Sequence, residues 1–295
     1  MSTAAVQPDR ETITRRPPIA WPIAVGFAAL AVPTAIHLAE QSWSVESGAQ
    51  GPIIIATGAW LLYRQWRSMR EDARPGPVWA TALLMAVSLA LYIFGRAYDF
   101  ITLEAGGVYG VGVAILNATI GPRQIMRNWF PLLYLAFAVP PPQFLLDSMT
   151  APLKHFVSMA ATNLLSAAGF PISREGVILF VAQYELLVED ACSGMNSLFG
   201  LTAIGLFYVY LMRGSSWLHS LVLTAFIVPI AIGANLLRIM TLVLITYYMG
   251  NEAAQGFLHG AAGIVLFVFA LALVFAVDQL LSLLIRPRKP SAVAA

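Results

Sequence analysis

Charged side chains are what this sequence has least of. Only 11% of its 295 residues are Asp, Glu, Lys or Arg, whereas soluble domains average about 25%. Hydrophobic residues make up 59% of the chain, more apolar surface than a water-soluble globule of this length can bury. The composition therefore predicts a polytopic membrane protein. The net charge of +2 gives no electrostatic support for a nucleic-acid partner.

Cysteine is nearly absent as well. Cys192 is the only one, so no disulfide can form within the chain. The four histidines are far apart, and no His or Cys pattern has the spacing of metal ligands, so we expect neither a metal nor another cofactor. The open question is whether Cys192 is a small buried residue, the usual role of a lone cysteine, or a nucleophile.

Long apolar runs predict membrane-spanning helices, because about 20 apolar residues cross the hydrocarbon core. The runs are Ile19–Leu38, Ser47–Tyr63, Pro77–Gly95, Gly107–Gly121, Trp129–Leu146, Ser193–Met212, Trp217–Met249 and Gly256–Ile285. We therefore predict an all-α membrane protein with about eight transmembrane helices. Ser47–Tyr63 and Gly107–Gly121 are the weakest runs, so six or seven spans are the alternatives.

The charges between the runs predict their orientation. Arginines gather before the first run and after the second, fourth, sixth and eighth, which places both termini in the cytoplasm. The opposite loops hold mainly acidic residues, namely Glu40, Glu46, Asp99 and Glu104 against Arg96. We expect a multi-pass membrane protein with cytoplasmic tails at residues 1–18 and 286–295.

Residues 147–191 should then lie on the outer face, between the N-terminal helices of residues 19–146 and the last helices of residues 192–285. The first half has apolar residues at helical spacing, which predicts an amphipathic helix at the membrane interface. After the breakers of "FPISREG", β-branched residues with a loose alternation predict a short hairpin or strand.

Three reactive side chains fall near the outer ends of the last spans. Cys192 precedes the sixth run, His259 begins the eighth, and Arg238 lies about 31 Å along the seventh run from Trp217. A thiolate is a nucleophile, and an imidazole can accept its proton and later protonate a leaving amine. Arginine can stabilise the oxyanion of a tetrahedral intermediate. The three residues together suit acyl transfer at a peptide carbonyl.

The segments "ACSGMNSLFGL", "NLLR" and "HGAAG", with "FAVPPP" and "GFPISREG" upstream, resemble the exosortase family of bacterial membrane cysteine transpeptidases. The resemblance implies that Cys192 is the nucleophile, Arg238 the active-site arginine and His259 the catalytic histidine. It also implies substrates that are exported proteins with a C-terminal sorting motif of Pro-Glu-Pro type, a transmembrane helix and a basic end. The resemblance places the protein in the bacterial inner membrane with its active site facing the periplasm, and surface-polysaccharide export machinery is a further candidate partner.

Other polar residues near these motifs are candidates for supporting roles. Asn235 lies on the same helix face as Arg238 and is expected to bridge helices, or else to assist the reaction. Glu189 and Asp190, beside Cys192 and Ser193, either orient the site or are solvated loop charges. Candidate substrate contacts are Arg174, Glu175, Glu185 and Asn196; many family members have a basic residue near Asn196, so the subtype and sorting signal stay open.

Two alternatives remain beside the cysteine transpeptidase. The same site would also suit plain hydrolysis, or acyl transfer to a lipid or polysaccharide. A transporter or non-catalytic export subunit is the alternative of another class. Transporters usually have charged residues in the middle of their membrane spans and an internal repeat. This sequence has few charged residues within its predicted spans and no inverted repeat.

Overall fold

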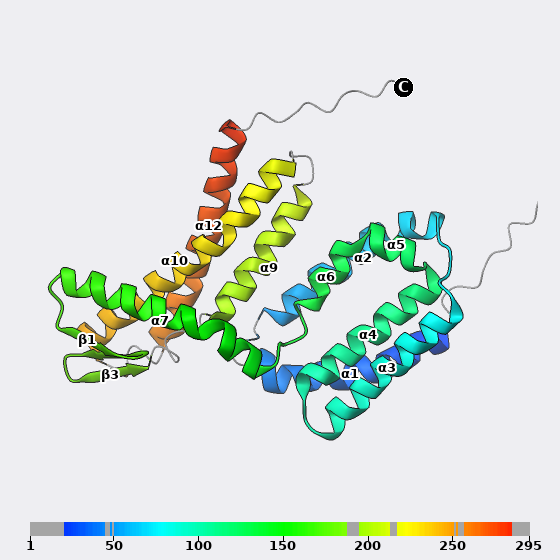
Figure 1. Ribbon diagram of the computed structural model, residues 1–295, viewed down its shortest axis with the longest axis horizontal. Coiled ribbons are helices and arrows are strands. Elements are labelled where there is room, and N and C mark those ends of the chain that lie inside the picture. Colours follow the sequence, from blue (N-terminus) through cyan, green and yellow to red (C-terminus); the bar gives the residue numbers. More distant parts are fainter. Residues whose placement is uncertain are drawn as a thin grey trace, which may run out of the picture.

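The computed structural model describes residues 21–44, 48, 50–187, 195–212, 217–250, 252 and 257–284 (Figure 1). Its elements are α1 (Trp21–Leu38), the π-helix η1 (Ala39–Trp43), α2 (Gly51–Glu71), α3 (Val78–Ala97), α4 (Ile101–Thr119), α5 (Pro122–Arg127), α6 (Trp129–Ala136), α7 (Gln143–Ala167), β1 (Ile172–Glu175), β2 (Ile178–Val181), β3 (Tyr184–Leu187), α9 (Met195–Leu211), α10 (Trp217–Met249) and α12 (Phe257–Leu284). The mainly helical membrane fold that the composition predicts agrees with these elements.

Five segments of the described chain are long and apolar enough to span a membrane. They are Trp21–Trp43, Val78–Ala97, Ile101–Thr119, Leu218–Met249 and Gly263–Leu283. Gly200–Leu211 of α9 is a shorter apolar helix. The predicted count of about eight is therefore matched only in part.

The helices form two groups (Figure 1). α1, α3 and α4 pack together, and α9, α10 and α12 form a second bundle. α2 and α6 lie between the groups, where Phe130 of α6 stacks on Tyr210 of α9 with ring centroids 3.9 Å apart. This aromatic contact joins the first half of the chain to the helices that carry the candidate site.

The predicted span Trp129–Leu146 is wrong. α6 ends at Ala136, and α7 begins at Gln143, four residues before the expected outer segment. The prolines at positions 140–142 stand between them, and proline both lacks an N–H donor and clashes with the preceding helical turn. An apolar run thus breaks into two helices where its backbone cannot continue one.

Two other predicted runs have different bounds. α2 extends past Tyr63 to Glu71 and takes three arginines into the helix, so it is not among the five spanning candidates. α4 begins at Ile101, six residues before the predicted start at Gly107, and is among them. The longer α4 encloses Glu104, which was expected in a loop.

Glu104 is wholly buried, and three neighbours satisfy its carboxylate. Thr34 and Arg96 donate hydrogen bonds of 2.8 and 2.9 Å to Oε1, and His37 Nδ1 lies 2.8 Å from Oε2. His37 also contacts Asp99, with Nε2 3.0 Å from Oδ1. A carboxylate inside a membrane helix is costly unless it is paired, and this cluster pairs it while tying α1, α3 and α4 together.

We expect Glu104→Gln to lower the free energy of unfolding by about 2 kcal/mol, because the neutral amide loses the ion pair with Arg96 and offers one acceptor oxygen where the carboxylate offers two. Thermal unfolding of the purified protein in detergent measures this. The matched control is Asp72→Asn, which removes the exposed ion pair with Arg127 and should change stability little. Equal effects of the two substitutions would contradict a structural role for the Glu104 cluster.

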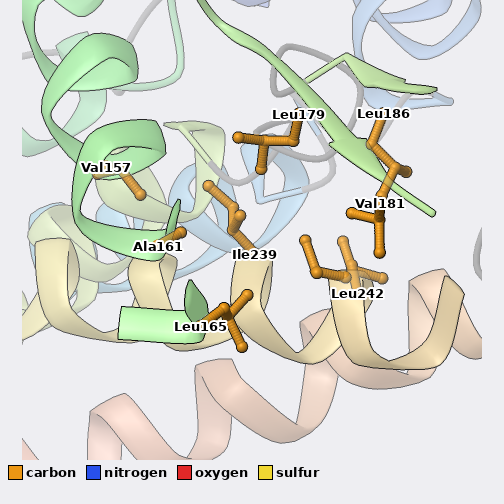
Figure 2. Packing of buried hydrophobic residues seen from close by; sticks show 9 residues of the cluster. Val157, Ala161, Leu165, Leu179, Val181, Leu186, Ile239 and Leu242 are labelled. Atoms are coloured by element: carbon orange, nitrogen blue, oxygen red, sulfur yellow. The ribbon is translucent and has the colours of Figure 1, made fainter. Parts of the chain in front are cut away.

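The three strands form one antiparallel sheet in the order β1-β2-β3, in agreement with the predicted hairpin. Ile172 pairs with Val181, and Ile178 pairs with Leu187. Figure 2 shows how α7 and the sheet pack on the last turns of α10. The buried residues of this cluster are Val157, Ala161, Leu165, Leu179, Val181, Leu186, Ile239, Leu242 and Val243. α7 and the sheet therefore cover one end of the second bundle.

Candidate functional site

Arg238 and Asn235 lie one turn apart on α10 and face the interior of the second bundle. The exposed fractions of the two residues are only 2% and 7%. Both line a cavity of about 20 Å³, measured as the space open to the centre of a water molecule. The other lining residues are Leu201 of α9, Ala231 and Ala234 of α10, and Gly263, Leu266 and Ala270 of α12.

The cavity combines one cation with apolar walls. Apart from Asn235 and Arg238, every residue that lines it is apolar. Its volume suffices for about one water molecule. A guanidinium group in such surroundings interacts strongly with a developing negative charge, because little water screens it. The arrangement therefore suits stabilisation of an oxyanion near Arg238.

Arg238 lies where the neighbours of α10 change. Ala231 packs with Leu201 of α9 and Ala270 of α12. Ile239 and Leu242 instead pack against α7 and the sheet (Figure 2). Arg238 thus stands between the apolar helix bundle and the cover formed by α7 and the sheet.

The cysteine motif lies outside the described residues. Glu189, Asp190, Cys192 and Ser193 fall between the end of β3 at Leu187 and the start of α9 at Met195. Their expected roles stay predictions.

His259 and Asn196 are placed only by their backbone. His259 lies in the first turn of α12 and Asn196 in the first turn of α9; their side chains are not among those described. Gly263, which lines the cavity, follows His259 by four residues, about one helical turn. The backbone at His259 is therefore about one turn along α12 from the wall of the Arg238 cavity.

The three other predicted substrate contacts lie on the sheet. Arg174 and Glu175 are exposed on β1, and Glu185 is exposed on β3. Arg174 donates a 2.9 Å hydrogen bond to the carbonyl of Gly176. These three side chains are exposed on the sheet, whereas Asn235 and Arg238 are buried.

A second polar cluster, which sequence reasoning missed, ties the same three helices together. Asp278 of α12 accepts a 2.6 Å hydrogen bond from Tyr208 of α9, and its other oxygen lies 2.6 Å from His219 Nε2 on α10. His219 precedes Arg238 by 19 residues, or about 28 Å of helix, so this cluster is far from the cavity. The signal was available: Asp278 is the sole acidic residue of α12, and a lone carboxylate in an apolar helix requires a partner.

Among the residues that the structure describes, no three His, Cys, Asp or Glu side chains are grouped to hold an ion. The buried carboxylates of Glu104 and Asp278 are instead engaged by side chains of neighbouring helices.

The apolar helices and the small cover at one end define a multi-pass membrane protein. The family model of the transmembrane exosortases matches residues 42–276. The chain therefore belongs to the transmembrane exosortase family, as the motifs had predicted. No curated protein and no solved structure matches it.

Family membership supports a membrane transpeptidase or protease role in general, with protein substrates that carry sorting tails. It carries no information on a polysaccharide-export partner, which stays a prediction.

Proposed function

We propose that this protein is a cysteine protease or transpeptidase that cleaves C-terminal sorting tails of exported proteins at the outer face of the bacterial inner membrane. The observation that carries the proposal is the burial of Arg238 in a cavity between α9, α10 and α12. Cys192 precedes α9 by three residues, and His259 lies in the first turn of α12. Along the chain, Leu201 of the cavity follows Cys192 by nine residues, and Gly263 follows His259 by four, which supports the proposal.

The proposed reaction has two steps. The Cys192 thiolate attacks the scissile carbonyl, Arg238 stabilises the oxyanion, and His259 protonates the leaving amine as the carbon–nitrogen bond breaks. A nucleophile then attacks the thioester carbonyl, releases Cys192 and gives its proton to His259. Water as that nucleophile leaves a free acid, whereas an amine or hydroxyl acceptor gives a transferred product.

The remaining predicted residues have secondary roles in this proposal. Asn235 bridges α10 to a neighbouring helix beside Arg238. Glu189, Asp190 and Ser193, which are next to Cys192 in the chain, orient the site. Arg174, Glu175 and Glu185 contact the substrate from the sheet, with Asn196 at the start of α9. The exposed apolar side chains of α7, among them Phe144, Phe156 and Leu164, suit contact with the lipid interface.

A tailed reporter tests the proposal. An exported protein that ends in a Pro-Glu-Pro-type motif, an apolar helix and a basic cluster should be shortened only in cells that produce the chain. Mass spectrometry of its new C-terminus should show either a free acid or an added group, which separates hydrolysis from transfer. A reporter with the motif scrambled but the helix and basic end retained is the control. Equal processing of both reporters, or of neither, would refute tail-specific cleavage.

A further inference from the structure

Six exposed arginines gather at the junction of α2 and α5, at the end of the first helix group. We call this set the arginine platform: Arg64, Arg67, Arg70, Arg74, Arg123 and Arg127. In Figure 1, α5 lies at the end of the molecule opposite β1 and β3. The platform is thus remote from the candidate site.

Hydrogen bonds to backbone carbonyls hold the two parts of the platform together. The Arg74 amide donates to the Ile120 carbonyl at 3.3 Å, and Gln124 Nε2 donates to the Asp72 carbonyl at 3.3 Å. At Gly121, which has a φ of +82°, a side chain would collide with the Arg74 carbonyl. These hydrogen bonds, and the absence of a side chain at Gly121, therefore fix α5 close to the segment that follows α2.

Most of the positive charge in the platform is uncompensated. Its neighbours Glu71 and Asp72 supply two carboxylates against six guanidinium groups. Arg127 forms an ion pair with Asp72 at 3.4 Å, and both side chains are largely exposed. Within the described residues, the other five arginines have no carboxylate at salt-bridge distance. The excess of guanidinium groups over carboxylates makes the platform suitable for binding anions.

The surroundings place the platform at a membrane boundary. The spanning candidate α4 ends beside it, and α3 begins there, with the Gly76 amide donating to the Asn117 carbonyl at 2.8 Å. The guanidinium of Arg64 lies 5.4 Å from the Trp60 ring centroid, and that of Arg70 lies 5.8 Å from the Trp66 ring centroid. Trp60 is exposed and Trp66 is half-buried, and tryptophan side chains are typical of the headgroup level, where their rings contact both lipid and water.

We propose that the arginine platform binds the phosphate groups of anionic phospholipids on the membrane face opposite the candidate site. The planar guanidinium group binds phosphate through two parallel hydrogen bonds, and stacking on Trp60 and Trp66 orients two of these groups in advance. Anionic lipids attract basic clusters that lie next to a membrane span. This inference depends on the membrane location and not on the proposed peptidase chemistry.

Native mass spectrometry of the full chain in detergent tests the proposal, with dioleoylphosphatidylglycerol as the probe and phosphatidylcholine as the zwitterionic comparison. We expect Arg67→Gln/Arg123→Gln to weaken phosphatidylglycerol binding by about tenfold, at an unchanged melting temperature. The charge-matched control is Lys154→Gln/Arg174→Gln, on α7 and β1, which should bind phosphatidylglycerol as the unmodified protein does.

Three results would overturn the proposal. The first is unchanged phosphatidylglycerol binding in Arg67→Gln/Arg123→Gln. The second is an equal loss in the two double variants, because binding would then follow net charge alone. The third is displacement of phosphatidylglycerol by millimolar inorganic phosphate, which would assign the platform to a soluble anion.

Discussion

Cys192→Ala is expected to abolish processing of a tailed substrate, with the rate falling by at least about three orders of magnitude. The reason is that no other thiol exists in the chain to form the acyl-enzyme. Alanine is close to cysteine in size, so a merely buried cysteine would tolerate the change. The measurement is the length of the reporter in cells, normalised to the amount of enzyme in the membrane.

The lone cysteine also makes a chemical control specific. A membrane-impermeant maleimide added from outside can react with this chain only at Cys192. We expect it to label the unmodified protein and stop processing, and to leave Cys192→Ala unlabelled. Labelling only from the cytoplasmic side would contradict the proposed topology, and full activity of Cys192→Ala would contradict the nucleophile.

The long apolar helices were the most predictable part of the fold. The predicted run Trp217–Met249 coincides with α10, and Gly256–Ile285 differs from α12 by one residue at each end. The sequence inside these runs is almost free of charge, and Pro229 does not end α10. Proline is tolerated in membrane helices because neighbouring groups satisfy the freed carbonyl.

The wrong predictions were those that used a single property of the sequence, either hydrophobicity or charge. Hydrophobicity joined Trp129 to Leu146, although the prolines at positions 140–142 end the helical backbone. Charge placed Glu104 in a loop, whereas its partner Thr34 lies 70 positions earlier in the chain. A partner so distant in sequence is visible only after α1 and α4 have packed.

The candidate site was predictable only along a single helix. The spacing of Asn235 and Arg238 places them on one face of α10, as the structure confirms. The cavity beside them depends on Ala231, Ala234 and Gly263, small residues whose significance appears only when α9 and α12 approach α10. Sequence periodicity gives the face of a helix but not the shape left between three helices.

Arg238→Gln is expected to lower the rate of reporter processing by about 10²–10³, the loss typical of removing one oxyanion donor. The side chain is buried at the cavity, so no outer residue can take its place readily. Arg238→Lys keeps the charge but loses the planar fork of donors, and should recover only part of the rate. Single-turnover cleavage in detergent measures the rate of the chemical step. Cross-linking of the protein to the reporter measures substrate binding separately.

The control must separate chemistry from stability, because Arg238 is also part of the packed interior. Asp278→Asn weakens a buried cluster in the same three helices, far from the cavity. It should lower the melting temperature while the rate per folded molecule stays unchanged. If Arg238→Gln behaves in the same way, with its rate following only the folded fraction, Arg238 holds helices together and does not stabilise the oxyanion. A large fall in rate at an unchanged melting temperature assigns it to the reaction.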